Sequence, residues 1–176
     1  MFDFVFATCR AGAEPALKRE VAARHGDLLT PAFMRPQLIT WKARVPLDAA
    51  FELGAVFGTV SGRSVGPARS AGEVAALVSG MSAPPTRLHV FPRVSPEDGL
   101  DAAAWAKLDV IRDEILKAAP ESFMREDMPI RDGEIVLDVI VGDNDEAWFV
   151  GCHRHSVTAH PDAGALTRKV VTPKAP

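Results

Sequence analysis

A cysteine and three histidines lie close together near the end of the 176-residue chain, in the run Cys152-His153-Arg154-His155, with His160 shortly after it. Thiolate and imidazole groups suit zinc, so a structural metal site is one hypothesis. On an extended strand, however, Cys152 and Arg154 face one side, while His153 and His155 face the other. Because the two sides cannot meet at one ion unless the strand breaks, the spacing argues against zinc.

The two histidines on one side of this strand, His153 and His155, also suggest proton transfer. One imidazole acting as general base and a second acting as general acid is the combination that RNA cleavage requires. No carboxylate near them in the sequence is an obvious group to orient either ring. A small RNA-cleaving enzyme or phosphoesterase is therefore an alternative interpretation and not the leading one.

A match to the serine nucleophile elbow, Gly-x-Ser-x-Gly, occurs at Gly62-Arg63-Ser64-Val65-Gly66. The elbow needs a sharp turn from strand to helix that exposes the serine. A proline and a linker-like segment follow instead, so we interpret the match as a glycine-rich strand end. The chain contains no P-loop, dinucleotide-binding glycine loop or Cys-x-x-Cys pair, and the scattered glycines of 54–62 follow a predicted helix, where no phosphate cradle is expected.

Charge is distributed unevenly along a chain whose formal net charge is only -3. Residues 95–148 contain 15 acidic and 5 basic residues, and the rest of the chain contains 8 acidic and 15 basic ones. An anionic partner would therefore meet the N-terminal part and the tail. A third interpretation is a protein-interaction adaptor whose acidic region, including residues 101–118, docks a basic partner.

The leading interpretation is RNA binding. Arginine and lysine neutralise phosphates, and imidazoles stack on exposed bases or form hydrogen bonds with them. The candidate RNA-binding residues are Arg10, Lys18, Arg19, His153, Arg154, His155, Arg168 and Lys169. We assign no catalytic, cofactor-binding or metal-binding residue.

The pattern of the first part of the chain predicts a ferredoxin-like β-α-β-β-α-β unit over residues 1–68. Strands are expected at 2–8, 28–34, 37–44 and 57–65, and helices at 13–24 and 46–53, the second of which has a proline at its entry. Residues 67–72 read as a linker.

A second α/β domain is predicted over residues 73–160, so the fold class is α/β (α+β). Helices are expected at 73–81 and 101–118, a strand at 87–94, and a hairpin with strands at 135–141 and 147–152 around a turn at 142–145. Residues 161–176 read as a tail or linker. No apolar run approaches the roughly 20 residues of a membrane span, so we expect a cytoplasmic protein with no membrane partner.

The segment 4–20 is similar to the opening strand and helix of bacterial ribosomal RNA ribose 2′-O-methyltransferases of the large-subunit cytidine type. Those proteins begin with a strand, a Cys-Arg-x-Gly-x-Glu stretch and a charged helix, which Cys9, Arg10, Gly12 and Glu14 match. In that family a ferredoxin-like domain precedes a THUMP domain, which binds RNA. The run 148–153 resembles the final THUMP strand, and 172–176 resembles the connector that comes after it.

The resemblance implies a module that presents structured RNA, expected to be ribosomal, to an S-adenosylmethionine-dependent methyltransferase domain or chain. It departs from the family in one respect, because the sequence contains no glycine-rich cofactor loop and no Lys-Asp-Lys-Glu catalytic set. S-adenosylmethionine is therefore expected only in the absent catalytic domain. The chain alone is not expected to methylate RNA.

Overall fold

The computed structural model describes residues 1–94, 100–123, 128–142 and 147–156 of a mixed α/β protein, which confirms the predicted fold class. Most of the turn predicted at 142–145 lies outside these residues. The elements, in chain order, are β1 (Phe2–Cys9), α1 (Glu14–His25), β2 (Leu29–Arg35), β3 (Leu38–Leu47), β4 (Gly58–Ala68), α2 (Ala71–Ser79), β5 (Arg87–Pro92), α3 (Ala102–Ala118), β6 (Ile135–Val141) and β7 (Trp148–Arg154).

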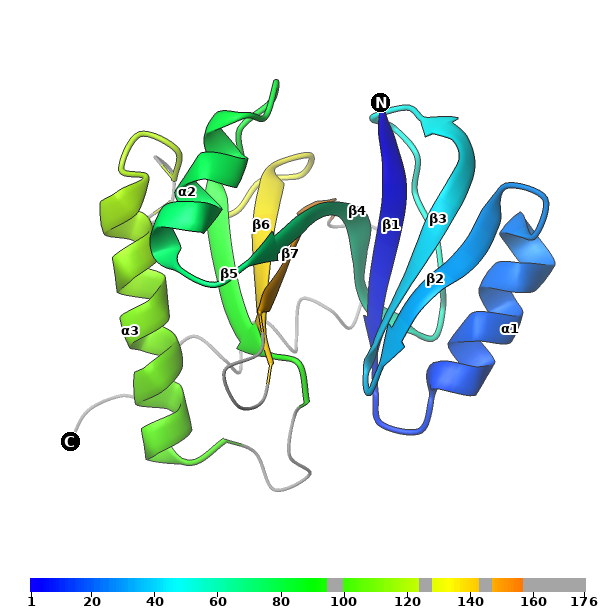
Figure 1. The fold of residues 1–176 in the computed structure, drawn as a ribbon, viewed down its shortest axis with the longest axis horizontal. Coiled ribbons are helices and arrows are strands. Elements are labelled where there is room, and N and C mark those ends of the chain that lie inside the picture. Colours follow the sequence, from blue (N-terminus) through cyan, green and yellow to red (C-terminus); the bar gives the residue numbers. More distant parts are fainter. Residues whose placement is uncertain (95–99, 124–127, 143–146, 157–176) are drawn as a thin grey trace.

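All seven strands belong to one sheet with the order β2-β3-β1-β4-β7-β6-β5 (Figure 1). In the first half, β1 pairs antiparallel with β3 and β4, and β3 pairs antiparallel with β2. Strands β1 and β2 therefore run in the same direction with β3 between them, which is the split β-α-β arrangement. In the second half, β5 and β6 are parallel and α3 lies between them in the chain, as a parallel pair requires.

Strand β4 belongs to both halves of the sheet. Its first part pairs with β1, from Gly58 to Arg63, and its second part pairs with β7, from Arg63 to Ala68. The predicted boundary at residue 68 coincides with the end of this strand, and the division of the chain into 1–68, 73–160 and 161–176 stays a prediction. The structure describes a hydrogen-bonded sheet that continues from one half into the other.

The three helices of the described chain cover the same face of the sheet. Arg63 is paired with Val5 on one side and with Cys152 on the other, so these three side chains point the same way. Val5 lies in the core beneath α1, together with Leu17, and Cys152 lies in the core beneath α2 and α3. The opposite face carries no described helix, and we call it the concave face.

The concave face is closely packed where β4 meets β7. A Cβ atom on Gly62 would lie 2.0 Å from the carbonyl oxygen of Cys152, and one on Gly151 would lie 2.3 Å from the ring of Phe6. Phe6 belongs to β1, and β4 separates that strand from β7. Its ring nevertheless reaches Gly151, so the sheet curves toward this face. Phe6, Leu38 and Ile140 form a small buried cluster at the centre of the curve.

The helix predicted at 46–53 is wrong. Leu47 is instead the last residue of β3 and pairs with Phe2, so the sheet extends into the segment. The following residues are held against α1, because Glu20 accepts hydrogen bonds from the backbone of Val56 and Phe57, at 2.8 and 3.1 Å. A helix of eight residues is marginal by itself, and α1 holds this segment from outside, for example through His25 Nε2, which lies 3.0 Å from the Leu53 carbonyl oxygen.

The longest predicted helix is confirmed as α3. Asp101 caps it by accepting a hydrogen bond from the Ala104 N–H at 2.7 Å. Its apolar side is buried through Leu108, Ile111 and Ile115. Among the described residues, no helix is long and apolar enough to cross a membrane.

Candidate functional site on the concave face

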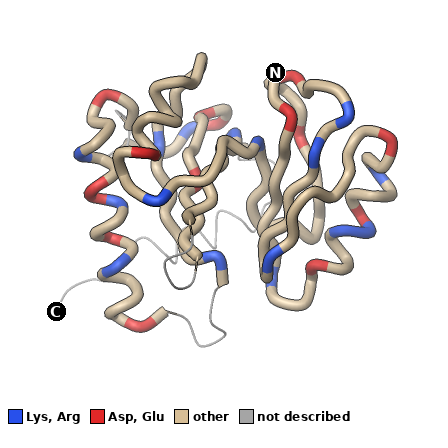
Figure 2. The backbone as a smooth tube through the Cα atoms, viewed as in Figure 1, with Lys and Arg blue, Asp and Glu red and all other residues tan. Residues whose placement is uncertain are grey.

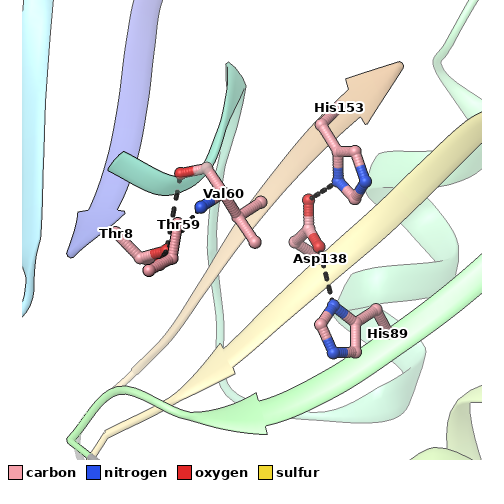
Figure 3. A network of polar contacts seen from close by, with 6 residues as sticks. All are labelled: Thr8, Thr59, Val60, His89, Asp138 and His153. Carbon is pink, nitrogen blue, oxygen red and sulfur yellow. Dashed lines mark hydrogen bonds and ion pairs between the residues drawn. The ribbon is translucent and has the colours of Figure 1, made fainter. Parts of the chain in front are cut away.

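Three ionisable side chains from neighbouring strands meet on the concave face. Asp138 of β6 lies between His89 of β5 and His153 of β7 (Figure 3). The Nδ1 atom of His153 is 2.6 Å from Oδ2 of Asp138, and Nδ1 of His89 is 3.2 Å from Oδ1. Asp138 has no exposed surface, whereas the side chains of His89 and His153 are 48% and 19% exposed. One buried carboxylate therefore orients two imidazoles that solvent reaches.

Charge stabilises this cluster. Burial opposes ionisation of Asp138, but the charge of His153 and the hydrogen bonds from both imidazoles outweigh it and hold the pKa of the carboxyl below its usual value. Burial likewise opposes protonation of His153, but the Asp138 charge and hydrogen bond raise the pKa of that imidazole. Each shift favours the charged form of its group, a carboxylate for Asp138 and an imidazolium for His153. Buried charges are stable in proteins when they are paired in this way.

A hollow of about 340 Å³ opens elsewhere on this face, between the two halves of the sheet. Three arginines line it: Arg35 at the end of β2, Arg69 after β4 and Arg93 after β5. The remaining lining residues are apolar side chains and one glycine: Phe33, Leu38, Pro67, Ile140, Gly142, Ala147, Trp148 and Phe149. Among the residues that the structure describes, neither Arg35 nor Arg69 forms an ion pair. Their guanidinium groups can therefore meet an anion.

Aromatic rings accompany basic side chains on the same face. The Arg35 guanidinium lies 4.6 Å from the centre of the Phe33 ring, and Lys42 Nζ lies 5.9 Å from that of Phe4. Both rings are exposed to solvent, Phe33 by 45%. Exposed aromatic rings and arginine planes are the groups on which nucleic-acid bases stack.

Of the predicted RNA-binding residues, three lie near α1. Arg10 is exposed in the loop after β1, and Lys18 and Arg19 are exposed on the helix itself. This helix covers the face opposite the concave one. Lys18 nevertheless lines a second hollow, which it shares with Arg35 at the edge of the sheet. Lys18 is thus close to the concave face at β2, whereas His153 and His155 lie at the end of β7, in the other half of the structure.

The other predicted residues belong to β7 and to the segment after it. His153 points to the concave face as the alternation predicts, and Cys152 is buried on the helix side. Arg154 is exposed and donates a hydrogen bond to the Gly133 carbonyl at 3.1 Å. Burial, and then the charge of His153, lowers the pKa of His155. Arg168 and Lys169 lie outside the described residues.

The structure gives no support to the metal or serine hypotheses. Burial raises the pKa of the Cys152 thiol to about 12, which is unsuited to a thiolate ligand. Within the described ranges, no group of three His, Cys, Asp or Glu residues could hold a metal ion, and His160 lies beyond them. Ser64 lies inside β4, which continues to Ala68, so the strand-to-helix turn that would expose a nucleophile is missing.

Sequence reasoning missed Asp138 and His89. A lone aspartate inside the apolar strand 135–141 was a usable signal, because a charge buried in a sheet needs a partner. The identity of the partner could not be read, since α3 separates β5 from β6 in the sequence. The structure thus supplies the orienting carboxylate that the sequence did not reveal for His153.

Comparison with known proteins identifies a shared fold and no family. No protein-family model matches the chain, and the search of curated proteins finds no significant match. The chain resembles the structure of a protein described as a predicted N6-adenine-specific DNA methylase from Listeria monocytogenes str. 4b F2365. The identity is 14% and the TM-score 0.50, with 97% of this chain and 48% of that chain covered.

Two further structures are similar at lower scores. A possible methylase from Clostridium difficile 630 has a TM-score of 0.46 at 12% identity, covering 85% of this chain and 40% of that one. A 4-thiouridine synthetase in complex with RNA and ATP has a TM-score of 0.42 at 12% identity, covering 88% and 42%. The chain spans less than half the length of each of these proteins. At such identities the likeness concerns the fold.

Proposed function

We propose that this chain is an RNA-binding module that positions structured RNA, ribosomal RNA in particular, for an S-adenosylmethionine-dependent RNA methyltransferase. The observation that carries the proposal is the concave face, where arginines line a hollow and exposed aromatic rings lie beside cations. Phosphate contacts of arginine and lysine fix an RNA on a surface, and stacking on aromatic rings holds its unpaired bases.

The methyltransferase part of the proposal has two supports. The segment 4–20 resembles the opening of ribosomal RNA ribose 2′-O-methyltransferases through Cys9, Arg10, Gly12 and Glu14. The fold also occurs within a protein described as a DNA methylase, of which this chain spans about half the length. The methyltransferase would be a neighbouring domain or a partner chain that holds its own cofactor. We accordingly propose that the chain acts in the cytoplasm.

The predicted basic residues extend the proposed surface beyond the hollow. Lys18 adjoins Arg35 at the edge of the sheet, and His153 lies on the concave face itself. The other members of the set are Arg10, Arg19, Arg154, His155, Arg168 and Lys169. An RNA that reaches all of them would follow the edge of the sheet as well as its concave side.

Fluorescence anisotropy with fragments of large-subunit ribosomal RNA, at salt concentrations from 50 to 200 mM, tests the proposal. Affinity should fall as salt rises, because bound phosphates release counterions. Arg35→Ala with Arg69→Ala should weaken binding. It should also reduce the slope of log affinity against log salt by about 1.4–1.8, since each phosphate contact contributes about 0.7–0.9.

The matched control is Lys107→Ala with Lys117→Ala on α3, which removes the same charge from exposed positions on the helix side. This helix carries three acidic and three basic residues along its length, so it is electrically balanced (Figures 1 and 2). The control pair should bind RNA as the unmodified chain does. Equal weakening by both pairs, or binding insensitive to salt, would contradict the proposal.

RNA cleavage remains a second candidate because of one observation, the contact between Asp138 and His153, which is the arrangement that orients a general base. Against it, neither of the two hollows described above includes His89 or His153. Incubation of labelled RNA with the chain, followed by gel analysis, tests this candidate. Cleavage that His153→Ala abolishes would favour it, and RNA that stays intact would exclude it.

A further inference from the structure

In the cluster of His89, Asp138 and His153, one carboxylate orients two imidazole rings on the concave face. Asp138 is buried completely and uses both of its oxygens to hold an imidazole. In each histidine the nitrogen engaged by the carboxylate is Nδ1, so Nε2 is the nitrogen turned away from it (Figure 3). The cluster therefore presents two ring nitrogens that are free of the carboxylate.

The fold fixes the position of both rings. His89 and Asp138 are partners in the parallel ladder of β5 and β6, and His153 lies two residues from the partner of Asp138 on β7. The His89 ring also packs against Phe91, with ring centres 4.4 Å apart. Rings held by strand pairing, a hydrogen bond and an aromatic neighbour lose little freedom when they bind a ligand.

Protonation changes the sign of the charge of this cluster. With both imidazoles neutral, the cluster carries the single negative charge of Asp138 and repels phosphate. With one imidazole protonated it is neutral, and with both protonated it is positive and presents two N–H donors at Nε2. Imidazoles in general change charge between about pH 5 and 8, and the charge of Asp138 raises the pKa of His153.

Within the described part of the chain, few other charged groups face the cluster. Arg87 lies two residues before His89 on β5 and therefore points to the same face. Its Nε atom forms an ion pair with Oε2 of Glu134 at 3.0 Å. His155 comes directly after the end of β7, and the charge of Asp132 acts on its imidazole. From β4, Arg63 acts on Cys152 on the helix side of the sheet and not on the concave side. The charged groups near the cluster in the described residues are thus one internal ion pair, the His155 imidazole and the Asp132 carboxylate.

We propose that His89 and His153, held by Asp138, bind backbone phosphates of RNA through Nε2 when their rings are protonated, and release them as the pH rises. This inference rests on the proposed RNA-binding function and adds a pH-dependent part to the interface. Asp138 is a positioning residue in this account, because it acts through the two imidazoles and does not touch the RNA.

The test measures the affinity of the 176-residue chain for a ribosomal RNA fragment at pH 6.0 and 8.0. We expect binding to be about tenfold weaker or more at pH 8.0, and the salt slope to be smaller by about 1.4–1.8, since two phosphate contacts are lost. His89→Gln with His153→Gln should lose most of the difference in affinity between the two pH values, and the remainder should come from His155. His89→Gln alone, at a half-exposed position, should lose part of the pH dependence.

His25→Gln is the matched control, because His25 lies in α1 and contacts the Leu53 carbonyl, far from the cluster in the fold. It should keep the full pH dependence. Asp138→Asn should move the midpoint of the affinity profile to lower pH, which a purely structural role of Asp138 would not do. The ring-proton NMR signals of His153 should titrate at higher pH when RNA is bound, by thermodynamic linkage.

The outcomes separate the two proposals. Salt-sensitive RNA binding that is the same at pH 6.0 and 8.0, or a pH dependence that survives His89→Gln with His153→Gln undiminished, overturns the inference and leaves the RNA-binding function intact. Absence of RNA binding at both pH values overturns the function and the inference together. RNA that is cleaved at pH 6.0 instead of bound overturns the inference in favour of catalysis.

Discussion

The Nδ1 atom of His153 lies 2.6 Å from Oδ2 of Asp138, a carboxylate with no exposed surface. Burial opposes charge on both groups, yet their mutual attraction lowers the pKa of Asp138 and raises the pKa of His153. The pair therefore contributes to the stability of the fold as well as to the proposed interface. The pH dependence of this stabilisation follows from the directions of the two pKa shifts.

The first prediction concerns that pH dependence. The lowered carboxyl pKa stabilises the fold at pH values above the unfolded-state pKa of about 4. This stabilisation is lost as the pH falls through the folded-state pKa. The raised imidazole pKa stabilises the fold fully at pH values below the unfolded-state pKa of about 6.5. This stabilisation is lost as the pH rises through the folded-state pKa. The pair thus contributes most between about pH 4 and 6.5. Asp138→Asn should lower the unfolding free energy by about 1–3 kcal/mol at pH 5.5 and by less at pH 8.5.

Urea unfolding at the two pH values measures this difference, with Asp113→Asn at an exposed position of α3 as the control. The control should change the unfolding free energy little at either pH. A loss for Asp138→Asn that is equal at pH 5.5 and 8.5 would show that the charge pair does not stabilise the fold.

The second prediction concerns the close approach of β4 and β7. A Cβ at Gly62 would lie 2.0 Å from a backbone oxygen of Cys152, which cannot move without breaking the pairing of the strands. Gly62→Ala should therefore destabilise the fold by at least the 1–3 kcal/mol that overpacking costs. Gly72→Ala, in α2, where an added Cβ would make only an ordinary contact with Ser70 Oγ at 3.9 Å, should be neutral or stabilising, because alanine favours a helix by about 1 kcal/mol. Thermal unfolding of the two variants would show no such contrast if the sheet were less tightly curved.

The third prediction concerns cooperativity. Because β4 pairs with β1 in one half and β7 in the other, the two halves share a strand and should unfold together. Native-state hydrogen exchange should give the most protected amides of β3 and β6 similar opening free energies. Markedly different values would mean that the halves open as separate units.

Much of the fold was accessible from the sequence because its elements carry local patterns. The apolar spacing of Leu108, Ile111 and Ile115 predicts α3, and these side chains are buried. The β-branched run 135–141 likewise predicts β6. In these segments the local preference and the tertiary environment agree, so the pattern is sufficient.

The segment 46–53 shows where local patterns fail. Pro46 and the residues after it have the composition of a short helix, but Leu47 pairs with Phe2 and Glu20 holds the backbone beyond. Those interactions come from residues about 30–45 positions away in the chain, and a short helix is too weak to compete with them. No local pattern reports a partner at such a distance.

The candidate site was predictable in part for the same reason. Strand alternation correctly places His153 and Cys152 on opposite faces. The partnership with Asp138 and His89 depends on the order of β5, β6 and β7, and the hollow depends on the meeting of residues from β2, β3, β4, β6 and β7. Both are properties of the assembled sheet.

Photo-crosslinking tests most directly whether the concave face is the RNA interface. Phe33 on that face and Trp105 on α3 are 45% and 43% exposed, so p-benzoylphenylalanine at either position has similar access to solvent. We predict that the chain with Phe33→p-benzoylphenylalanine crosslinks to a bound ribosomal RNA fragment and that the chain with Trp105→p-benzoylphenylalanine does not. Crosslinking at position 105 without crosslinking at position 33 would contradict the account.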